Sequence, residues 1–325
     1  MRIVLAVHEP PMWTLPLHEV ARITAELRDD EVVDARTSDD RIAAYPGAEV
    51  IVANRMSAAE FDAARDARWI HATAVGVGGL MISPLVDSDV IVTNTKGVHS
   101  DAIAEHAIAL ALAVRRNLHT ASLRQTAREW AQLEFAARRV KLLAASHMLV
   151  VGLGAIGSRV AMLAAGLGMR VTGVRRHPNE PRPAGVSDVF GPDRLHEALA
   201  DADVVVLAVP RTDQTKAMFG AEEFAAMKPS AVFVNVARGR LVDEAALVAA
   251  LEAEQLAGAG LDAFEVEPLP EDHPLWRLPN VLITPHAAAF ADDYWAPAVD
   301  LFLENVSRYK RSEPLINVVH KGRGY

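Results

Sequence analysis

Short apolar runs alternate with helical patterns along the first 95 residues of the chain. Each run has the length of a strand, and the stretches between them carry apolar residues at the three- and four-residue spacing of an amphipathic helix. Strands that are separated by helices favour a parallel, doubly wound sheet. The predicted strands are Arg2–Val7, Glu49–Ala53, Trp69–Ala72 and Val90–Thr93, and the predicted helices are Leu17–Leu27 and Ala58–Arg65.

A long helical pattern begins at residues 99–101 and runs to about Arg115. It is alanine-rich and apolar on most faces, so we expect a buried helix that connects a first domain to a second. Residues 117–145 also have a helical pattern, with Trp130 and Phe135 placed among charged residues. Such a segment is either a pair of surface helices or a subunit contact, and the pattern leaves both interpretations open.

The alternation of strands and helices then resumes and continues to about residue 287. Six predicted strands, with helices between most of them, indicate a nucleotide-binding domain over residues 99–287. We expect the chain from residue 288 to return to the first domain, which would then consist of residues 1–98 and 288–325. The strands are Met148–Val151, Arg170–Val174, Asp203–Ala208, Ala231–Val236, Gly258–Leu261 and Val281–Ile283, and the helices are Asp193–Ala200, Ala221–Met227, Glu244–Glu254 and Tyr294–Lys310.

The turn after the first of these strands has the spacing Gly-x-Gly-x-x-Gly and opens into a helical pattern. In a dinucleotide-binding unit the first glycine allows the tight turn, the second lets the backbone approach a pyrophosphate, and the third lets helix and strand pack closely. The start of the helix offers free N–H groups and a partial positive charge to the phosphates. The residues predicted to contact a coenzyme here are Gly152, Gly154, Ala155, Ile156 and Gly157.

Composition narrows the classes of protein that fit. Of the 325 residues, 51% are hydrophobic and 23% are charged, as in ordinary globular proteins. The net charge of −9 and the lack of a basic stripe argue against a nucleic-acid binder. The absence of cysteine excludes disulfides and thiolate metal ligands, and we predict no metal site. Because neither a signal peptide nor an apolar run of about 18 residues is evident, we expect no membrane segment and a cytoplasmic location.

Chemically active side chains follow several predicted strands of the second domain. Arg238, Asp262 and His286 each lie just after a strand, and Glu267 lies in the same loop as Asp262. Ligands of an open parallel sheet bind outside the carboxyl ends of its strands, so these side chains can converge on one crevice. A single arginine or histidine in such a place is usually structural, and the prediction therefore depends on the combination.

A guanidinium, an imidazole and a carboxylate suit the reduction of a 2-keto acid. Arg238 can bind the substrate carboxylate and polarise the ketone with its planar set of donors. His286 can give a proton to the ketone oxygen as hydride arrives at C2, because an imidazole titrates near neutral pH. Glu267, if it pairs with His286, favours the imidazolium and orients the ring. The sequence thus predicts Arg238, Glu267 and His286 as catalytic residues.

Four linked stretches of the second half carry a resemblance to a known family. They are residues 151–157, 234–243, 261–270 and 280–286, with the sequences VGLGAIG, VNVARGRLVD, LDAFEVEPLP and NVLITPH. In order and spacing they resemble the D-isomer-specific 2-hydroxyacid dehydrogenase family, and residues 50–118 resemble it more weakly. The resemblance implies the same catalytic roles for Arg238, Glu267 and His286, and it places Asp262 near the nicotinamide. It also implies coenzyme contacts at Pro210, Val236 and Ala237, whereas His106, inside the apolar connecting helix, is interpreted as structural.

The resemblance further implies the architecture and the class of substrate. We expect two doubly wound parallel-sheet domains, with a Rossmann NAD(P)-binding domain inserted into a discontinuous, flavodoxin-like substrate domain. The substrate would be a small 2-keto acid such as glyoxylate or hydroxypyruvate, reduced to a D-2-hydroxy acid in a cleft that closes on it. Members of the family are commonly homodimers, packed through their nucleotide-binding domains.

A glycine-rich loop in the first domain matches the family position where backbone amides hold the substrate carboxylate. On this basis Val75 and Gly76 are predicted substrate contacts, although the loop also fits an ordinary turn. Many family members have an aspartate soon after Gly-Val, whereas this chain continues with Gly78 and Gly79, which leaves the preferred substrate open. Arg55, at the end of another strand, is either a further substrate contact or a surface residue.

The end of the second strand of the nucleotide-binding domain bears on the choice of coenzyme. An acidic residue there binds the ribose hydroxyls of NAD and repels a 2′-phosphate. This chain has Arg175 and Arg176 at that position and no carboxylate. Arginine suits a phosphate dianion, so we predict contacts from both residues and a preference for NADP(H) over NAD(H); the alternative is a solvated basic turn.

Three other functions share these features. A phosphoglycerate dehydrogenase-like enzyme would use the same residues on a phosphorylated substrate. Formate dehydrogenases of the family pair the histidine with a glutamine, whereas Glu267 is acidic here. A non-catalytic, NAD(H)-sensing relative of the transcriptional corepressors can keep the same residues without turnover. A panel of 2-keto acids, together with a steady-state assay with formate, separates these functions.

Overall fold

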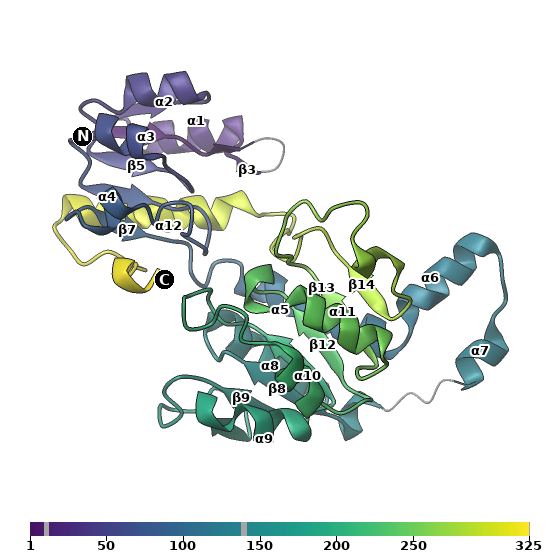
Figure 1. Cartoon of the computed structure of the whole chain (residues 1–325). Helices are drawn as coiled ribbons and strands as arrows, with labels where there is room; N and C mark the ends of the chain where they lie inside the picture. Colours follow the sequence, from purple (N-terminus) through teal and green to yellow (C-terminus); the bar gives the residue numbers. More distant parts are fainter. Residues whose placement is uncertain (10–12, 138–141, 325) are drawn as a thin grey trace. The chain divides into compact units, whose positions relative to one another are not determined.

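The computed structural model describes residues 1–9, 13–137 and 142–324, and it divides into two compact units (Figure 1). The first unit comprises Met1–His99 and Ala291–Tyr325, and the second comprises Ser100–Phe290. Each unit is built on its own parallel sheet, so the predicted class of two doubly wound α/β domains is confirmed. Among the described residues, no helix has both the length and the apolar character that a membrane crossing requires.

The sheet of the first unit has the strand order β4-β1-β5-β6-β7, with all neighbours parallel. The order reverses between β1 and β5, which is the arrangement of flavodoxin-like sheets. A two-stranded antiparallel hairpin, β2–β3, follows β1. The strands are β1 (Arg2–Leu5), β2 (His8–Glu9), β3 (Trp13–Thr14), β4 (Glu31–Asp34), β5 (Val50–Val52), β6 (Trp69–His71) and β7 (Ile91–Thr93).

Helices cover both faces of this sheet, because successive strand residues alternate between the faces. Ile3 and Leu5 pack with α1 and α12, whereas Val4 packs in the core on the other face with α2 and α4. Helix α12 comes from the end of the chain, so the unit is discontinuous in sequence. The helices are α1 (Leu17–Glu26), α2 (Ser38–Ala44), α3 (Ala58–Ala63), α4 (Ser83–Val86), α12 (Trp295–Lys310) and the 3-10 turn η5 (Lys321–Arg323).

The second unit has a seven-stranded parallel sheet in the order β10-β9-β8-β11-β12-β13-β14. Its first strand, β8, lies inside the sheet, and the order reverses between β8 and β11, as in Rossmann folds. Met148 and Val150 pack with α5 and α8 on one face, and Leu149 and Val151 pack with α9, α10 and α11 on the other. The strands are β8 (His147–Val151), β9 (Arg170–Val174), β10 (Asp188–Phe190), β11 (Val204–Leu207), β12 (Val232–Asn235), β13 (Gly258–Leu261) and β14 (Val281–Ile283).

The helices of this unit include the predicted long connecting helix, α5, which is buried along most of its length. The segment after it forms α6 and α7, which extend away from the rest of the unit (Figure 1). The helices are α5 (Ser100–Arg115), α6 (Leu118–Ala127), α7 (Gln132–Ala137), α8 (Ala155–Gly166), α9 (Leu195–Ala200), α10 (Ala221–Ala226) and α11 (Glu244–Glu252), with 3-10 turns η1 (Leu143–Ala145), η2 (Pro192–Arg194), η3 (Gly239–Leu241) and η4 (Pro274–Arg277).

The structure contains three strand features that the pattern did not predict, and all are short or lie at an edge. β4 and β10 are the outer strands of their sheets, with partly exposed, partly polar sequences, so they lack a continuous apolar run. The β2–β3 hairpin has two residues in each strand. Helix α2 was also missed, although Thr37 and Asp40 form a capping box that marks its start.

The glycine motif lets α8 begin directly after β8, where the strand order of the second sheet reverses between β8 and β11. Gly152 has φ = 101°, and a Cβ there would lie 2.6 Å from the carbonyl oxygen of Ala208, just after β11. A Cβ on Gly157 would lie 1.8 Å from the carbonyl oxygen of Gly152. Both contacts are closer than any side chain permits, so the turn and the packing of α8 on β8 require glycine.

Candidate active site

His286 and Glu267 form a hydrogen-bonded pair at the carboxyl edge of the second sheet. His286 follows β14, Glu267 lies in the loop after β13, and His286 Nδ1 is 2.7 Å from Glu267 Oε2. The other carboxylate oxygen of Glu267 accepts a hydrogen bond of 2.9 Å from the backbone N–H of Phe264. Each of the two paired side chains keeps 35% of its surface exposed, so the pair is oriented and still accessible.

The carboxylate of Glu267 is held in its charged form. Burial opposes its ionisation, but the hydrogen bonds from His286 and Phe264 and the charges of His286 and Arg238 outweigh that effect. The pKa of Glu267 therefore lies below its ordinary value. The hydrogen bond to this carboxylate fixes the plane of the His286 ring.

Arg238 lies directly after β12, and its guanidinium interacts electrostatically with the same carboxylate. Its Nη1 donates a 2.6 Å hydrogen bond to the carbonyl oxygen of Ala237. Burial lowers the pKa of Arg238, while the charges of Glu267 and Asp262 oppose that shift. The guanidinium stays cationic at neutral pH. Loops that follow three neighbouring strands, β12, β13 and β14, thus bring Arg238, Glu267 and His286 together.

Asp262 holds the loop that carries His286. This side chain is 2% exposed, and its two oxygens accept hydrogen bonds from Ala287 N (2.8 Å), Ala288 N (3.0 Å) and the hydroxyl of Thr284 (2.6 Å). His286 itself has φ = 51°, in the left-handed region that costs an L-residue about 1 kcal/mol or more. The resemblance implied a place near the nicotinamide for Asp262, which stays a prediction; in the structure its carboxylate binds the backbone and hydroxyl donors around His286.

The turn after β8 has the features of a pyrophosphate site. Helix α8 begins after Gly154, which makes no side-chain cap, so the first N–H groups of the helix, at Ala155, Ile156 and Gly157, point out of its start. A Cβ added to Gly154 would meet nothing within 4 Å, which leaves space for a ligand to approach the backbone. The residues fit a dinucleotide, with Pro210 after β11 and Val236 and Ala237 after β12 at the same sheet edge.

The two arginines after β9 have different surroundings. Arg175 turns toward its own loop: its guanidinium donates to the carbonyl oxygens of Glu180 and Pro181 (3.2 Å for the latter) and is 12% exposed. Arg176 is an exposed residue whose Nη2 donates a 3.0 Å hydrogen bond to Gln214 Oε1. Arg175 thus holds its own loop at Glu180 and Pro181, and Arg176 presents the more accessible guanidinium.

In the first unit, the predicted substrate residues lie at the carboxyl edge of the five-stranded sheet. The loop that follows β6 is tied to its neighbours on both sides: Asn94 Nδ2 donates to the carbonyl oxygen of Val75 (2.8 Å), and Met56 N donates to that of Gly79 (3.0 Å). Gly76 is exposed, and so is Arg55, which follows β5. The loop is therefore held at its base while the Gly76 segment remains open to a ligand.

Comparison with known families finds a match to the model of the "D-isomer specific 2-hydroxyacid dehydrogenase, NAD binding domain" over residues 108–288, more than half of the chain. The chain belongs to the D-isomer-specific 2-hydroxyacid dehydrogenase family. The resemblance inferred from the four sequence stretches is confirmed. The protein is therefore an oxidoreductase, a 2-hydroxyacid dehydrogenase with a domain that binds a nicotinamide dinucleotide.

Individual relatives of this dehydrogenase differ in the substrate that their names give. A glyoxylate reductase from Korarchaeum cryptofilum is 34% identical over 278 residues, or 83% of this chain and 81% of that one. A D-3-phosphoglycerate dehydrogenase from Methanocaldococcus jannaschii is 33% identical over 94% of this chain but only 58% of its own length. A D-isomer specific 2-hydroxyacid dehydrogenase from Xanthobacter autotrophicus Py2, crystallised with NADPH and MES, superimposes with a TM-score of 0.85 at 29% identity, covering 100% of this chain and 99% of that one.

Thr284 is a part of the dehydrogenase's site that sequence reasoning missed. Its hydroxyl donates to Asp262 and lies 2.9 Å from His106 Nε2, which is itself 3.6 Å from Asp262. The position of Thr284, directly after β14 and two residues before His286, is the sequence feature that could have identified it. His106, interpreted as structural, lies in α5 and takes part in the network around Asp262.

Proposed function

We propose that this dehydrogenase reduces small 2-keto acids, such as glyoxylate or hydroxypyruvate, to D-2-hydroxy acids with NADPH as the preferred coenzyme. The observation that carries the proposal is the constellation of one cationic guanidinium and one carboxylate-paired imidazole, Arg238 with His286 and Glu267. The glyoxylate reductase name of the Korarchaeum cryptofilum relative supports the choice of substrate.

The roles of the residues follow from their hydrogen bonds. The coenzyme, when bound, supplies the hydride that adds to C2 of the keto acid. Arg238 offers its planar donors to the substrate carboxylate and ketone oxygen. Because His286 Nδ1 is engaged by Glu267, Nε2 is the nitrogen that gives its proton to the ketone oxygen. Glu267 then holds the neutral ring, which regains a proton from solvent. On the first unit, Val75 and Gly76 would bind the substrate carboxylate through backbone N–H groups, and Arg55 would add a side-chain contact.

The test of the proposed function is a steady-state assay with a panel of acids and both coenzymes. Oxidation of NADPH with glyoxylate or hydroxypyruvate supports the proposal. Turnover restricted to 3-phosphohydroxypyruvate would instead support the second candidate, a phosphoglycerate dehydrogenase-like enzyme, which the similarity over 94% of this chain favours. Coenzyme binding without turnover of any 2-keto acid would indicate an NAD(H)-sensing, corepressor-like protein.

The different surroundings of Arg175 and Arg176 lead to a prediction about coenzyme preference. We expect Arg176→Ala to lower the ratio of kcat/KM with NADPH to kcat/KM with NADH about ten-fold or more, because a charge-assisted hydrogen bond contributes about 1.5–3 kcal/mol. Arg175→Ala should change the ratio less, since the Arg175 guanidinium already binds its own loop. Arg194→Ala, at an exposed arginine paired with Glu197, is the control. A preference for NADH in the wild type would overturn the NADP(H) assignment.

The lowered pKa of Glu267 leads to a prediction about how kcat/KM depends on pH. The pKa of Glu267 lies below its ordinary value of 4.5, so the carboxylate that orients His286 stays charged throughout the neutral range and loses its charge only at more acidic pH. The value of kcat/KM should therefore remain above half of its neutral value at pH 4.5 and fall at lower pH. Glu267→Gln removes the carboxylate, so kcat/KM should be lower throughout the neutral range and should lack this acidic fall. The measurement is the pH profile of kcat/KM with glyoxylate; an unchanged kcat/KM at neutral pH in Glu267→Gln would show that Glu267 does not assist the proton donor.

We further propose that the protein is a homodimer with a contact through α6 and α7. Leu123, Trp130 and Leu133 are 65%, 90% and 87% exposed on this extended segment, an apolar surface typical of protein–protein contacts. Residues 138–141 of the predicted contact segment lie outside the described residues. Sedimentation equilibrium should give twice the mass of the 35.1 kDa chain. The cytoplasmic location expected from the sequence stays a prediction.

A further inference from the structure

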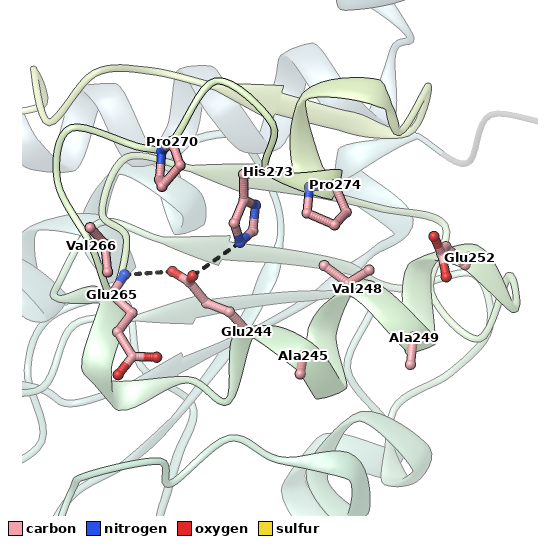
Figure 2. A pocket seen from close by; sticks show the side chains of 10 residues that line it. All are labelled: Glu244, Ala245, Val248, Ala249, Glu252, Glu265, Val266, Pro270, His273 and Pro274. Carbon is pink, nitrogen blue, oxygen red and sulfur yellow. Dashed lines mark hydrogen bonds and ion pairs between the residues drawn. The ribbon is translucent and has the colours of Figure 1, made fainter.

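A surface pocket separates α11 from the loop that carries Glu267. It has a volume of about 530 Å³ and lies between the helix and residues 265–274 (Figure 2). Arg238, Glu267 and His286 do not line it, so it lies apart from the catalytic side chains. Apolar packing between the helix and the loop is therefore incomplete at the pocket, although Phe264 and Leu275 join the core cluster of α11 on either side of it. The lining residues are Glu244, Ala245, Val248, Ala249, Glu252, Glu265, Val266, Pro270, His273 and Pro274.

Glu244 spans this gap. It is the first residue of α11, and Figure 2 shows both of the interactions drawn in the pocket meeting at its carboxylate. Oε1 accepts a 2.5 Å hydrogen bond from the backbone N–H of Glu265, and Oε2 lies 3.5 Å from His273 Nε2. His273 Nδ1 accepts a long hydrogen bond, 3.4 Å, from Leu275 N, which leaves Nε2 to carry the ring proton toward Glu244.

The environment of Glu244 makes its carboxylate depend on these partners. Burial raises the pKa of Glu244, as do the charges of Glu265 and Glu267, whereas the Glu265 N–H and the charge of His273 oppose the shift. The helix that bears it is anchored in the core by Leu247 and Leu251, which are 1% and 2% exposed. Glu244 thus connects a helix anchored in the core to the backbone of the loop at Glu265 and to the ring of His273.

The segment that precedes α11 packs closely against the peptide group between Phe264 and Glu265. A Cβ on Gly239, next to Arg238, would lie 1.8 Å from the carbonyl carbon of Phe264 and 2.2 Å from Glu265 N. The neighbouring N–H, that of Phe264, donates to the carboxylate of Glu267. One short segment, Arg238 to Glu244, therefore both carries the substrate guanidinium and fixes the backbone that orients Glu267.

We propose that Glu244 is a positioning residue for the Glu267–His286 pair, acting through the backbone at Glu265 and the ring of His273. The expected loss of rate rests on the proposed function. The expected loss of the Glu267–His286 hydrogen bond rests on the contacts of Glu244 alone. Without the Glu244 carboxylate, the loop is released toward the pocket, and Glu267 no longer meets His286 Nδ1 at hydrogen-bonding distance.

The experiment compares Glu244→Ala and Glu244→Gln with Glu252→Ala, which alters the same helix and the same pocket at an exposed residue. Glu244→Ala should lower kcat for glyoxylate reduction about 10- to 100-fold, since a displacement of about 1 Å in a catalytic group has effects of this size. The acidic fall of kcat/KM should move to higher pH, because the hydrogen bond from His286 is what mainly lowers the pKa of Glu267, while the Kd for NADPH changes less than about two-fold. Glu244→Gln, which keeps an acceptor for Glu265 N–H, should recover most of the lost rate, and Glu252→Ala should resemble the wild type.

A crystal structure of Glu244→Ala separates this inference from the proposed function. A Glu267–His286 distance beyond hydrogen-bonding range would support the positioning role even if the wild type reduced none of the 2-keto acids. Retention of the 2.7 Å contact, or an unchanged kcat and pH profile in an active enzyme, would overturn it. Equal losses of kcat, NADPH affinity and thermal stability would also overturn it, because they would show that Glu244 only supports folding.

Discussion

Replacing His286 should nearly abolish ketone reduction and leave coenzyme binding intact. In His286→Ala the ketone oxygen has no proton donor in place as hydride arrives, and loss of a general acid costs about 10²- to 10⁴-fold in rate. The pyrophosphate turn around Gly152–Gly157 is formed by other residues, so the Kd for NADPH should stay close to the wild-type value. The measurements are kcat/KM for glyoxylate and a fluorescence titration with NADPH.

The backbone at His286 calls for a second variant. Because φ is 51° at this residue, alanine keeps the strain of the left-handed region, whereas asparagine tolerates it. His286→Asn should therefore preserve the loop and the hydrogen bonds to Asp262, and still lose the proton donor. Equal inactivity of the two variants, with coenzyme affinity retained in both, assigns the loss to chemistry. A parallel fall in NADPH affinity would point to misfolding and contradict the role of His286.

Removal of the Arg238 guanidinium should cost about 3 kcal/mol of transition-state stabilisation, or about 10²-fold in kcat/KM for the 2-keto acid. The oxygen of the ketone gains negative charge as hydride adds, and Arg238 is the cationic donor beside the Glu267–His286 pair. Arg238→Lys should restore little, because an ammonium lacks the planar set of donors that matches a carboxylate.

Arg240→Ala provides a matched control for this prediction. Arg240 belongs to the same segment, two residues along the chain, but it is exposed. We expect a kcat/KM within about two-fold of the wild type, since surface substitutions away from special features usually have small effects. Similar losses in the two variants would indicate that the segment had shifted, and the assignment of Arg238 as the substrate guanidinium would fail.

The order of strands and helices was largely readable from the chain because buried parallel strands are continuous apolar runs. Residues 148–151 form such a run, and the glycines after it have a steric reason that the structure confirms at Gly152 and Gly157. Strands β4 and β10 could not be found in this way, because an edge strand is half solvated and needs no apolar run.

The candidate residues for catalysis could also be selected from the sequence, since a keto acid needs a cation and a proton donor, and parallel strands end at one edge of a sheet. The hydrogen bonds that hold these side chains in place could not be predicted from the sequence. The place of Asp262 near the nicotinamide stays a prediction, and only the structure shows that the path of the loop after β14 turns two backbone N–H groups and the Thr284 hydroxyl toward its carboxylate. Glu244 is the first residue of α11, and no motif indicates that its carboxylate reaches Glu265.

The amino-acid sequence alone determined the doubly wound class, the family and the side chains available for chemistry, because these depend on local periodicity and on residue identity. Only the tertiary structure decided that Glu267 meets His286 at 2.7 Å, that His286 adopts a left-handed backbone, and that Arg175 is occupied by its own loop. Those features depend on loop paths, which are set by hydrogen bonds between residues that are distant in sequence. Local preferences do not encode such bonds, and packing of the whole unit selects them.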